Sequence, residues 1–186
     1  MAKKAKVTGV IVSSVDARQV LHALNKLPKE VQAEIRSRNL VESNALAREI
    51  VMAAYDPKVP PQAELVAKSV KAQRDRMIKV KIGGDKKVGR PYRKRTGTDE
   101  NGKATYKTVR AEAGRLVWGA EHGSSGKDKD RSGRTMGARF VRPNRTHARN
   151  QFNGYWVGPV IAVQGPEIAE RWKKLCQKAI NGLGLD

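Results

Sequence analysis

The stretch PKEVQAEIRSRNLVESNALAREIVMAAY, residues 28–55, carries the longest helical pattern of the chain. Apolar residues recur in it about every 3.6 residues with charged residues between them, which is the pattern of an amphipathic helix. The apolar positions are Val31, Ile35, Val41, Ala45, Leu46, Ile50 and Ala54. Pro28 favours a helix start here, because a proline in the first turn loses no hydrogen bond. We expect this helix to bury one face and to end at Tyr55.

Shorter elements flank this helix on both sides. Towards the N-terminus, Val7–Val12 is rich in β-branched residues and predicts a short strand. Asp16 is a suitable N-cap for a helix that continues to Leu27. Towards the C-terminus, Gln62–Ala72 predicts a short helix after a pair of prolines. The strict alternation of Ile78–Ile82 then predicts a strand that is buried on one face.

The C-terminal half predicts one more strand and one more helix. Arg115–Gly119 has alternating apolar residues and is predicted to be a strand, whereas the aromatic segment Asn153–Val163 is broken by Gly158 and Pro159. Pro166 begins the last helix, which is amphipathic. Its apolar residues are Ile168, Trp172, Leu175, Cys176, Ala179, Ile180 and Leu183. This order predicts one α+β domain, residues 1–186, with long N-terminal helices and a C-terminal amphipathic helix packed on a small antiparallel sheet.

Positive charge is concentrated in three stretches. The 186 residues include 38 Lys and Arg against 18 Asp and Glu, which gives a formal net charge of +20. Residues 1–9, 86–110 and 127–149 contribute +3, +7 and +6 of it, so the rest of the chain is nearly neutral. We predict two flexible basic excursions, residues 86–110 and 123–139, with a turn at Asp99–Gly102 that suits a hairpin tip. Such segments bind a polyanion or an acidic protein surface.

Several classes of protein are disfavoured by the residues present. The single Cys176 excludes an intramolecular disulfide. No run of about eighteen apolar residues occurs, so no membrane partner is expected. The three histidines, His22, His122 and His147, lack the spacing of metal ligands, and no catalytic triad or phosphate-binding loop is evident. We therefore expect no metal, no cofactor and no catalysis.

The basic residues of the two excursions are the candidate binding residues. They are Lys86, Lys87, Arg90, Arg93, Lys94, Arg95, Arg131, Arg134 and Arg139. Side chains of this kind contact phosphates in nucleic-acid-binding proteins, and Tyr92 offers a surface for base stacking. The same residues equally suit a solubilising segment or one that binds a neighbouring subunit, so both interpretations stay open. Trp118, Trp156 and Trp172 are predicted to be core residues first, and interface residues as the alternative.

Three short motifs occur in an order that resembles a known family. Leu65–Val70 follows a helix and a proline-rich link, Trp118–Gly123 follows the predicted strands, and Phe140–Pro143 precedes the last helix. This order resembles the tail-completion family of long-tailed bacteriophages. The residues concerned are Trp118, Gly119, Glu121, Gly123, Phe140, Arg142 and Pro143, with Glu121, Gly123, Phe140 and Pro143 at the matching positions. His122 stands where the family usually has an aromatic residue.

The resemblance implies a structural virion protein without catalytic activity, assembled in the host cytoplasm. It implies a homo-oligomeric ring at the neck or the head-proximal end of the tail, which joins or terminates the tail tube at the head connector. The implied partners are other neck and tail-tube proteins, with contact to packaged double-stranded DNA. In that interpretation, the basic excursions become ordered on assembly. Glu121 and Arg142 either hold the Gly119–Gly123 turn or are ordinary surface charges.

Two other functions are compatible with the residues. A non-specific nucleic-acid-binding protein would be a monomer or dimer whose affinity for DNA or RNA falls steeply with salt. A nuclease would use Glu121, His122 and His147 and would depend on a metal ion.

Overall fold

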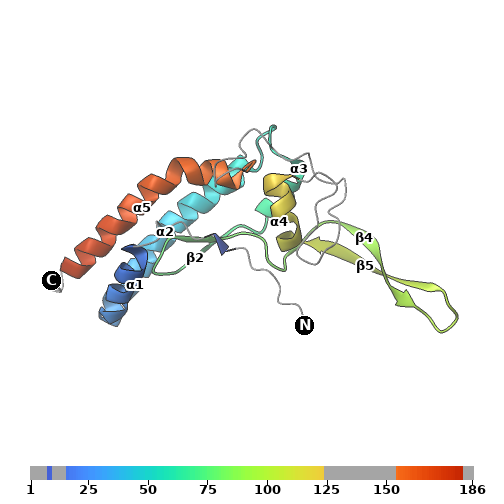
Figure 1. Cartoon of the computed structure of the whole chain (residues 1–186), viewed down its shortest axis with the longest axis horizontal. Helices are drawn as coiled ribbons and strands as arrows, with labels where there is room; N and C mark the ends of the chain where they lie inside the picture. The colour runs from blue at the N-terminus through green and yellow to red at the C-terminus, as the bar shows by residue number, and fades with distance from the viewer. Residues whose placement is uncertain (1–7, 10–15, 124–153, 182–186) are drawn as a thin grey trace.

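A computed structural model describes residues 8–9, 16–123 and 154–181 of the chain. Over these residues the fold is α+β, as the sequence predicts. The helices are α1 (Asp16–Lys26), α2 (Lys29–Ala53), α3 (Pro61–Ala67), α4 (Ala113–His122) and α5 (Val157–Asn181). The strands are β1 (Thr8–Gly9), β2 (Lys71–Gln73), β3 (Lys79–Lys81), β4 (Lys87–Thr98) and β5 (Ala104–Glu112). Figure 1 shows α2 and α5 side by side and antiparallel, with β4 and β5 extending away from the helices.

The α2 helix confirms the long amphipathic pattern at Ile35, Leu46 and Ile50, which are buried, but its buried stripe departs from the prediction at two positions. Val41 is 68% exposed and Ala45 also lies at the surface, although the pattern predicts that both face the core. Asn39 and Ser43 are fully buried in their place, in one stripe along the helix. The buried residues of the stripe are Ile35, Asn39, Ser43, Leu46, Ala47 and Ile50. Two polar side chains therefore occupy core positions, and they need hydrogen-bond partners there.

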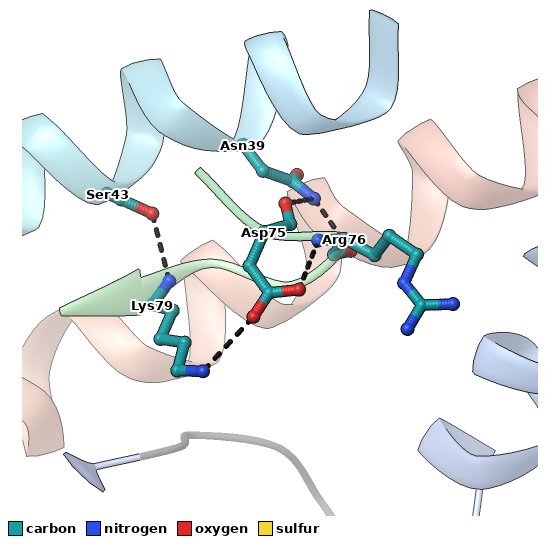
Figure 2. A network of polar contacts seen from close by, with 5 residues as sticks. All are labelled: Asn39, Ser43, Asp75, Arg76 and Lys79. Atoms are coloured by element: carbon teal, nitrogen blue, oxygen red, sulfur yellow. Dashed lines mark hydrogen bonds and ion pairs between the residues drawn. The ribbon is translucent and has the colours of Figure 1, made fainter. Parts of the chain in front are cut away.

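Those partners are main-chain groups of the segment that joins β2 to β3 (Figure 2). Asn39 Nδ2 donates to the carbonyl oxygen of Arg76 at 2.7 Å, and Ser43 Oγ accepts from the N–H of Lys79 at 2.9 Å. From α5, Trp172 Nε1 donates to the same Arg76 oxygen at 2.9 Å. Both long helices thus hold the chain between β2 and the first residue of β3 in place, and their side chains satisfy part-buried backbone groups there.

Asp75 lies in the same segment and forms an ion pair with Lys79 at 3.1 Å. Burial opposes ionisation of this carboxyl group. The hydrogen bonds from Lys79 and from the Arg76 N–H, with the charges of both residues, nevertheless hold the pKa of Asp75 below its ordinary value. Its contribution to stability is therefore present at neutral pH and is lost as the pH falls through that lowered pKa.

The first sheet has the strand order β1-β3-β2 and is antiparallel. Its central strand confirms the predicted alternation, because Ile78, Val80 and Ile82 are buried on one face. The predicted N-terminal strand is present over Thr8–Gly9 at the sheet edge, and its other residues lie outside the described part. The predicted helix Gln62–Ala72 is too long, since α3 ends at Ala67 and Lys71 begins β2.

In the C-terminal half, the predicted strand is wrong, and the predicted amphipathic helix is confirmed with Ile168, Trp172 and Cys176 buried but with a different start. Arg115–Gly119 is helical, because the buried residues of α4 follow a helical period: Ala113, Val117, Ala120 and Glu121. A five-residue alternating run is too short to separate a strand from a helix. The last helix begins at Val157 instead of Pro166, and Pro166 lies inside it. Pro159 fits in the first turn, and Figure 1 shows that the helix changes direction along its length, as an interior proline requires.

The core is one cluster with contributions from all the helices and from the first sheet. Trp156 and Trp172 are buried in it, as predicted. Trp118 is not a core residue, because 63% of its side chain is exposed. Cys176 is buried, and this burial raises the pKa of its thiol to about 12, so the thiol is protonated and unreactive in the folded chain.

Replacement of Ser43 tests the contact between α2 and the β2–β3 segment. Ser43→Ala leaves the part-buried Lys79 N–H without its acceptor, so we expect a loss of about 1–2 kcal/mol in the free energy of unfolding, measured by urea denaturation. The exposed Asn44, next to Ser43 on the same helix, provides the control. Asn44→Ala should not lower stability by more than about 0.5 kcal/mol, and equal losses in the two variants would contradict this account.

Candidate functional site

Strands β4 and β5 form a long antiparallel hairpin that lies largely outside the body of the protein (Figure 1). All residues from 90 to 103 are exposed. A two-stranded sheet with both faces in water has little apolar burial to stabilise it. Among the described residues, the hairpin is therefore the element with the least stabilisation from the rest of the fold.

The hairpin corrects the prediction that residues 86–110 form a loop-like excursion. The segment is two paired strands, and the predicted turn at Asp99–Gly102 is confirmed as their tip. Asp99 closes the tip: its Oδ1 accepts from the N–H groups of Asn101 at 3.0 Å and Lys103 at 2.8 Å. Gly102 has a φ of +76°, which suits glycine. The strands contain threonine and tyrosine, which favour β-structure, but the many charged residues between them made the segment resemble a loop in the sequence.

The pairing register places like charges opposite one another. Lys94 pairs with Lys107, and such a pair of ammonium groups is unfavourable on an isolated hairpin. On the other face, the Arg93 guanidinium lies 4.8 Å from the centre of the Tyr106 ring, within the range of a cation–π contact. Tyr106 is 52% exposed. The hairpin therefore presents a charged face and an aromatic, arginine-bearing face, both open to a partner.

The base of the hairpin is joined firmly to the body. The N–H groups of Ala113 and Gly114 donate to the carbonyl oxygens of Lys86 and Gly84 at 2.8 and 2.9 Å. The two backbone segments approach so closely that a Cβ on Gly114 would lie 2.9 Å from Gly84 atoms. Glu112 accepts ion pairs from Lys87 at 2.8 Å and from Arg115 at 3.1 Å. These contacts fix the direction in which the hairpin leaves the body.

The structure divides the predicted basic residues into two groups. Lys86, Lys87 and Arg90 lie at the base of the hairpin, and Arg93, Lys94 and Arg95 lie along β4. Arg131, Arg134, Arg139, Phe140, Arg142 and Pro143 lie outside the described residues, as does the excursion 123–139 after Gly123.

Glu121 has a role that the sequence alone did not indicate. It is 7% exposed at the end of α4, and both oxygens of its carboxylate accept backbone N–H groups at the start of α5. The distances are 2.9 Å to Val157 N and 2.7 Å to Gly158 N. The carboxylate thus satisfies free N–H groups of the helix and meets the positive end of its dipole. It is not a surface charge, and its contacts are with α5 rather than with a turn at 119–123.

Gly154 leaves the space that this carboxylate occupies. A Cβ at position 154 would lie 1.4 Å from Glu121 Oε1, so no larger residue fits without moving the carboxylate. The N–H of Tyr155 also donates to the Glu121 carbonyl oxygen at 2.7 Å. Glu121 therefore holds the start of α5 through both its side chain and its main chain.

The rest of the Trp118–Gly123 motif ends α4. Gly119 and Gly123 are buried, and Gly123 has a φ of +72° and donates its N–H to the Gly119 carbonyl oxygen at 2.9 Å. Gly123 therefore ends α4 in a backbone conformation that favours glycine, and it is not part of the predicted turn after a strand. The Trp118 and His122 rings lie 4.2 Å apart between centres, on the outer side of the helix.

The nuclease alternative required Glu121, His122 and His147 to act together. Both Glu121 oxygens are occupied by backbone donors, and His147 lies outside the described residues. Among the residues that the structure describes, no three His, Cys, Asp or Glu side chains are grouped as a metal site would require. Over the same residues, no helix is both long and apolar enough to cross a membrane.

Comparisons with known proteins add no further constraint on the site. No protein-family model, no curated protein and no solved structure matches the chain.

Replacement of Glu121 tests the junction between α4 and α5. Glu121→Ala removes two charge-assisted hydrogen bonds and leaves buried N–H groups unpaired, so we expect a loss of about 2–4 kcal/mol in the free energy of unfolding. Gly154→Ala should be at least as destabilising, because its new Cβ displaces the same carboxylate. Glu167 on the exposed side of α5 is the control, and Glu167→Ala should cost less than about 0.5 kcal/mol. Urea denaturation of the three variants measures the difference, and a mild Glu121→Ala effect would show that the cap is dispensable.

Proposed function

We propose that the chain is a structural subunit of a bacteriophage neck or head-proximal tail end, where copies assemble into a ring through the β4–β5 hairpin. The order of short motifs around Glu121 supports the family. The hairpin supports assembly, and it is the observation that carries the proposal. The work of such a protein is mechanical, since complementary surfaces join the tail tube to the head connector.

The hairpin has the physical properties of an assembly element. Its strands leave main-chain donors and acceptors at two exposed edges, which are surfaces on which another chain can add a strand. β4 has twelve residues and β5 has nine, and the body of the protein covers only the base of the hairpin that they form. Binding to a neighbouring subunit would bury these edges and the face that bears Tyr106.

Ring geometry follows from the asymmetry of this contact. In the proposed ring, the hairpin at one end of the body meets a different surface on the next copy, because a contact between two hairpins would close after two subunits. A contact between two different surfaces repeats from subunit to subunit, and it closes into a ring when the rotation between copies divides a full turn. Tyrosine and arginine are frequent among residues that dominate binding energy, and Arg93 and Tyr106 form such a pair.

Tyr106→Ala tests assembly through the hairpin. We expect wild-type protein to form a closed oligomer, and the variant to require at least about tenfold more protein to assemble, which is a typical cost of removing an aromatic contact residue. Sedimentation velocity over a concentration series measures the shift, with neck and tail-tube proteins of the same phage added if the chain alone stays monomeric. Tyr55, 53% exposed at the end of α2, is the matched control, and Tyr55→Ala should assemble normally.

The proposed position in the virion has its own test. Particles made without the chain should accumulate as separate heads and tails, which electron microscopy can count. Complete particles in its absence, or equal effects of Tyr106→Ala and Tyr55→Ala on assembly, would contradict the proposal.

A further inference from the structure

An open cleft of about 690 Å³ lies between α3 and the base of the hairpin. Leu65 and Lys68 at the end of α3 form one wall, and residues of β4 and β5 form the other. Five of its lining residues are cationic, and none is acidic: Lys68, Lys86, Lys87, Arg90 and Arg110. Three separate segments of the chain thus bring positive charge to one concave surface.

The backbone of β4 is shaped to place Arg90 at this cleft. The pairing register shifts between Val88 and Tyr92, so residues 89–91 bulge out of the ladder opposite Arg110. Gly89 has a φ of +74°, which a residue with a side chain rarely adopts. Val88, just before the bulge, is buried and holds this part of the strand against the body. The two arginines therefore belong to a built feature of the hairpin base.

The cations of the cleft are incompletely neutralised by the protein. Lys87 pairs with Glu112 at 2.8 Å, and Lys86 Nζ donates to the carbonyl oxygen of Lys68. Within the described part of the chain, Lys68, Arg90 and Arg110 have no acidic partner. Like charges held in one concavity repel each other, and an anion with several oxygens relieves that repulsion. Guanidinium groups suit the tetrahedral oxygens of phosphate, which they bind through two parallel hydrogen bonds.

A second copy of the chain is a poor source of this anion. Acidic residues are outnumbered by basic ones, 18 to 38. Many of the described carboxylates are already occupied within the fold, in ion pairs or at the start of α5. These are Glu34, Glu42, Asp75, Glu112, Glu121 and Glu167. The excess of basic residues therefore favours an anion from outside the chain.

The hairpin beyond the cleft indicates a polymer rather than a small ion. Lys94 and Lys107 continue the positive charge along one face of the hairpin, whose strands rise about 3.3 Å per residue, and Arg93 and Arg95 add charge on the face that bears Tyr106. We propose that the cleft of Lys68, Arg90 and Arg110 binds backbone phosphates of a nucleic acid, one for each of these cations and independently of base sequence, and that the hairpin contacts the phosphates that follow. This inference does not rest on ring assembly, because the cleft belongs to a single chain.

The experiment is a salt titration of the full-length protein with a fluorescently labelled DNA duplex of about 20 base pairs and arbitrary sequence, followed by fluorescence anisotropy. Arg90→Gln combined with Arg110→Gln should weaken binding at least about tenfold. It should also lower the slope of log affinity against log salt concentration by about 1.8, the value expected for two lost phosphate contacts. Lys68→Gln alone should lower the slope by about 0.9. A second sequence of equal length should bind equally well.

The matched control changes the same net charge away from the cleft. Lys29 and Lys178 are exposed near the end of the helical body opposite the hairpin, and Lys29→Gln combined with Lys178→Gln should leave affinity within about twofold of wild type. An equal loss in the two double variants would overturn the proposal, since it would show a net-charge effect without a site.

Competition identifies the anion. Polyglutamate of equal charge should compete much less well than unlabelled DNA, and equal competition would overturn the assignment to phosphate and favour an acidic protein surface instead. If Arg90→Gln with Arg110→Gln lowers the unfolding midpoint, the salt slope of Lys68→Gln decides the question by itself, and an unchanged slope in that variant would overturn the proposal.

Discussion

The carboxylate of Glu121 is the contact on which the closed body of this protein depends. It lies at the end of α4 and accepts two N–H groups from the start of α5, 36 residues later in the chain. The start of a helix has free donors and a partial positive charge, and burying it without an acceptor would be costly. Because Gly154 leaves the necessary space, the acceptor reaches those donors directly. The position of α5 against α2, and with it the core, follows from this junction.

A second set of polar contacts completes the packing of the two long helices. Asn39 and Ser43 of α2 and Trp172 of α5 bond to main-chain atoms between β2 and β3. Hydrogen bonds between a side chain and the backbone define geometry more narrowly than apolar contact does. The body is therefore held together by directional contacts as well as by its modest core, and it supports a hairpin that has little stability of its own.

Local patterns predicted the elements whose causes are local. The long helix at 29–53, the buried alternation of Ile78–Ile82 and the hairpin tip at Asp99–Gly102 each depend on residues near in sequence. The sequence did not predict that Asn39 and Ser43 would be buried, because their acceptors and donors lie 36 or more residues away. The cap by Glu121 and the grouping of Lys68, Arg90 and Arg110 were missed for the same reason. Charge density along the chain indicated a candidate binding region but not which cations would share a surface.

The close backbone contact at Gly83, Gly84 and Gly114 gives the hairpin a rigid mounting. A Cβ at Gly83 would lie 2.8 Å from Val117 of α4, so the chain just before β4 packs directly against that helix. A force applied at the tip of the hairpin would therefore be transmitted to α4 at its base. From α4 it would reach the start of α5 through the hydrogen bonds of Glu121. Load on the far end of the hairpin and the orientation of the C-terminal helix are thereby mechanically coupled within one subunit.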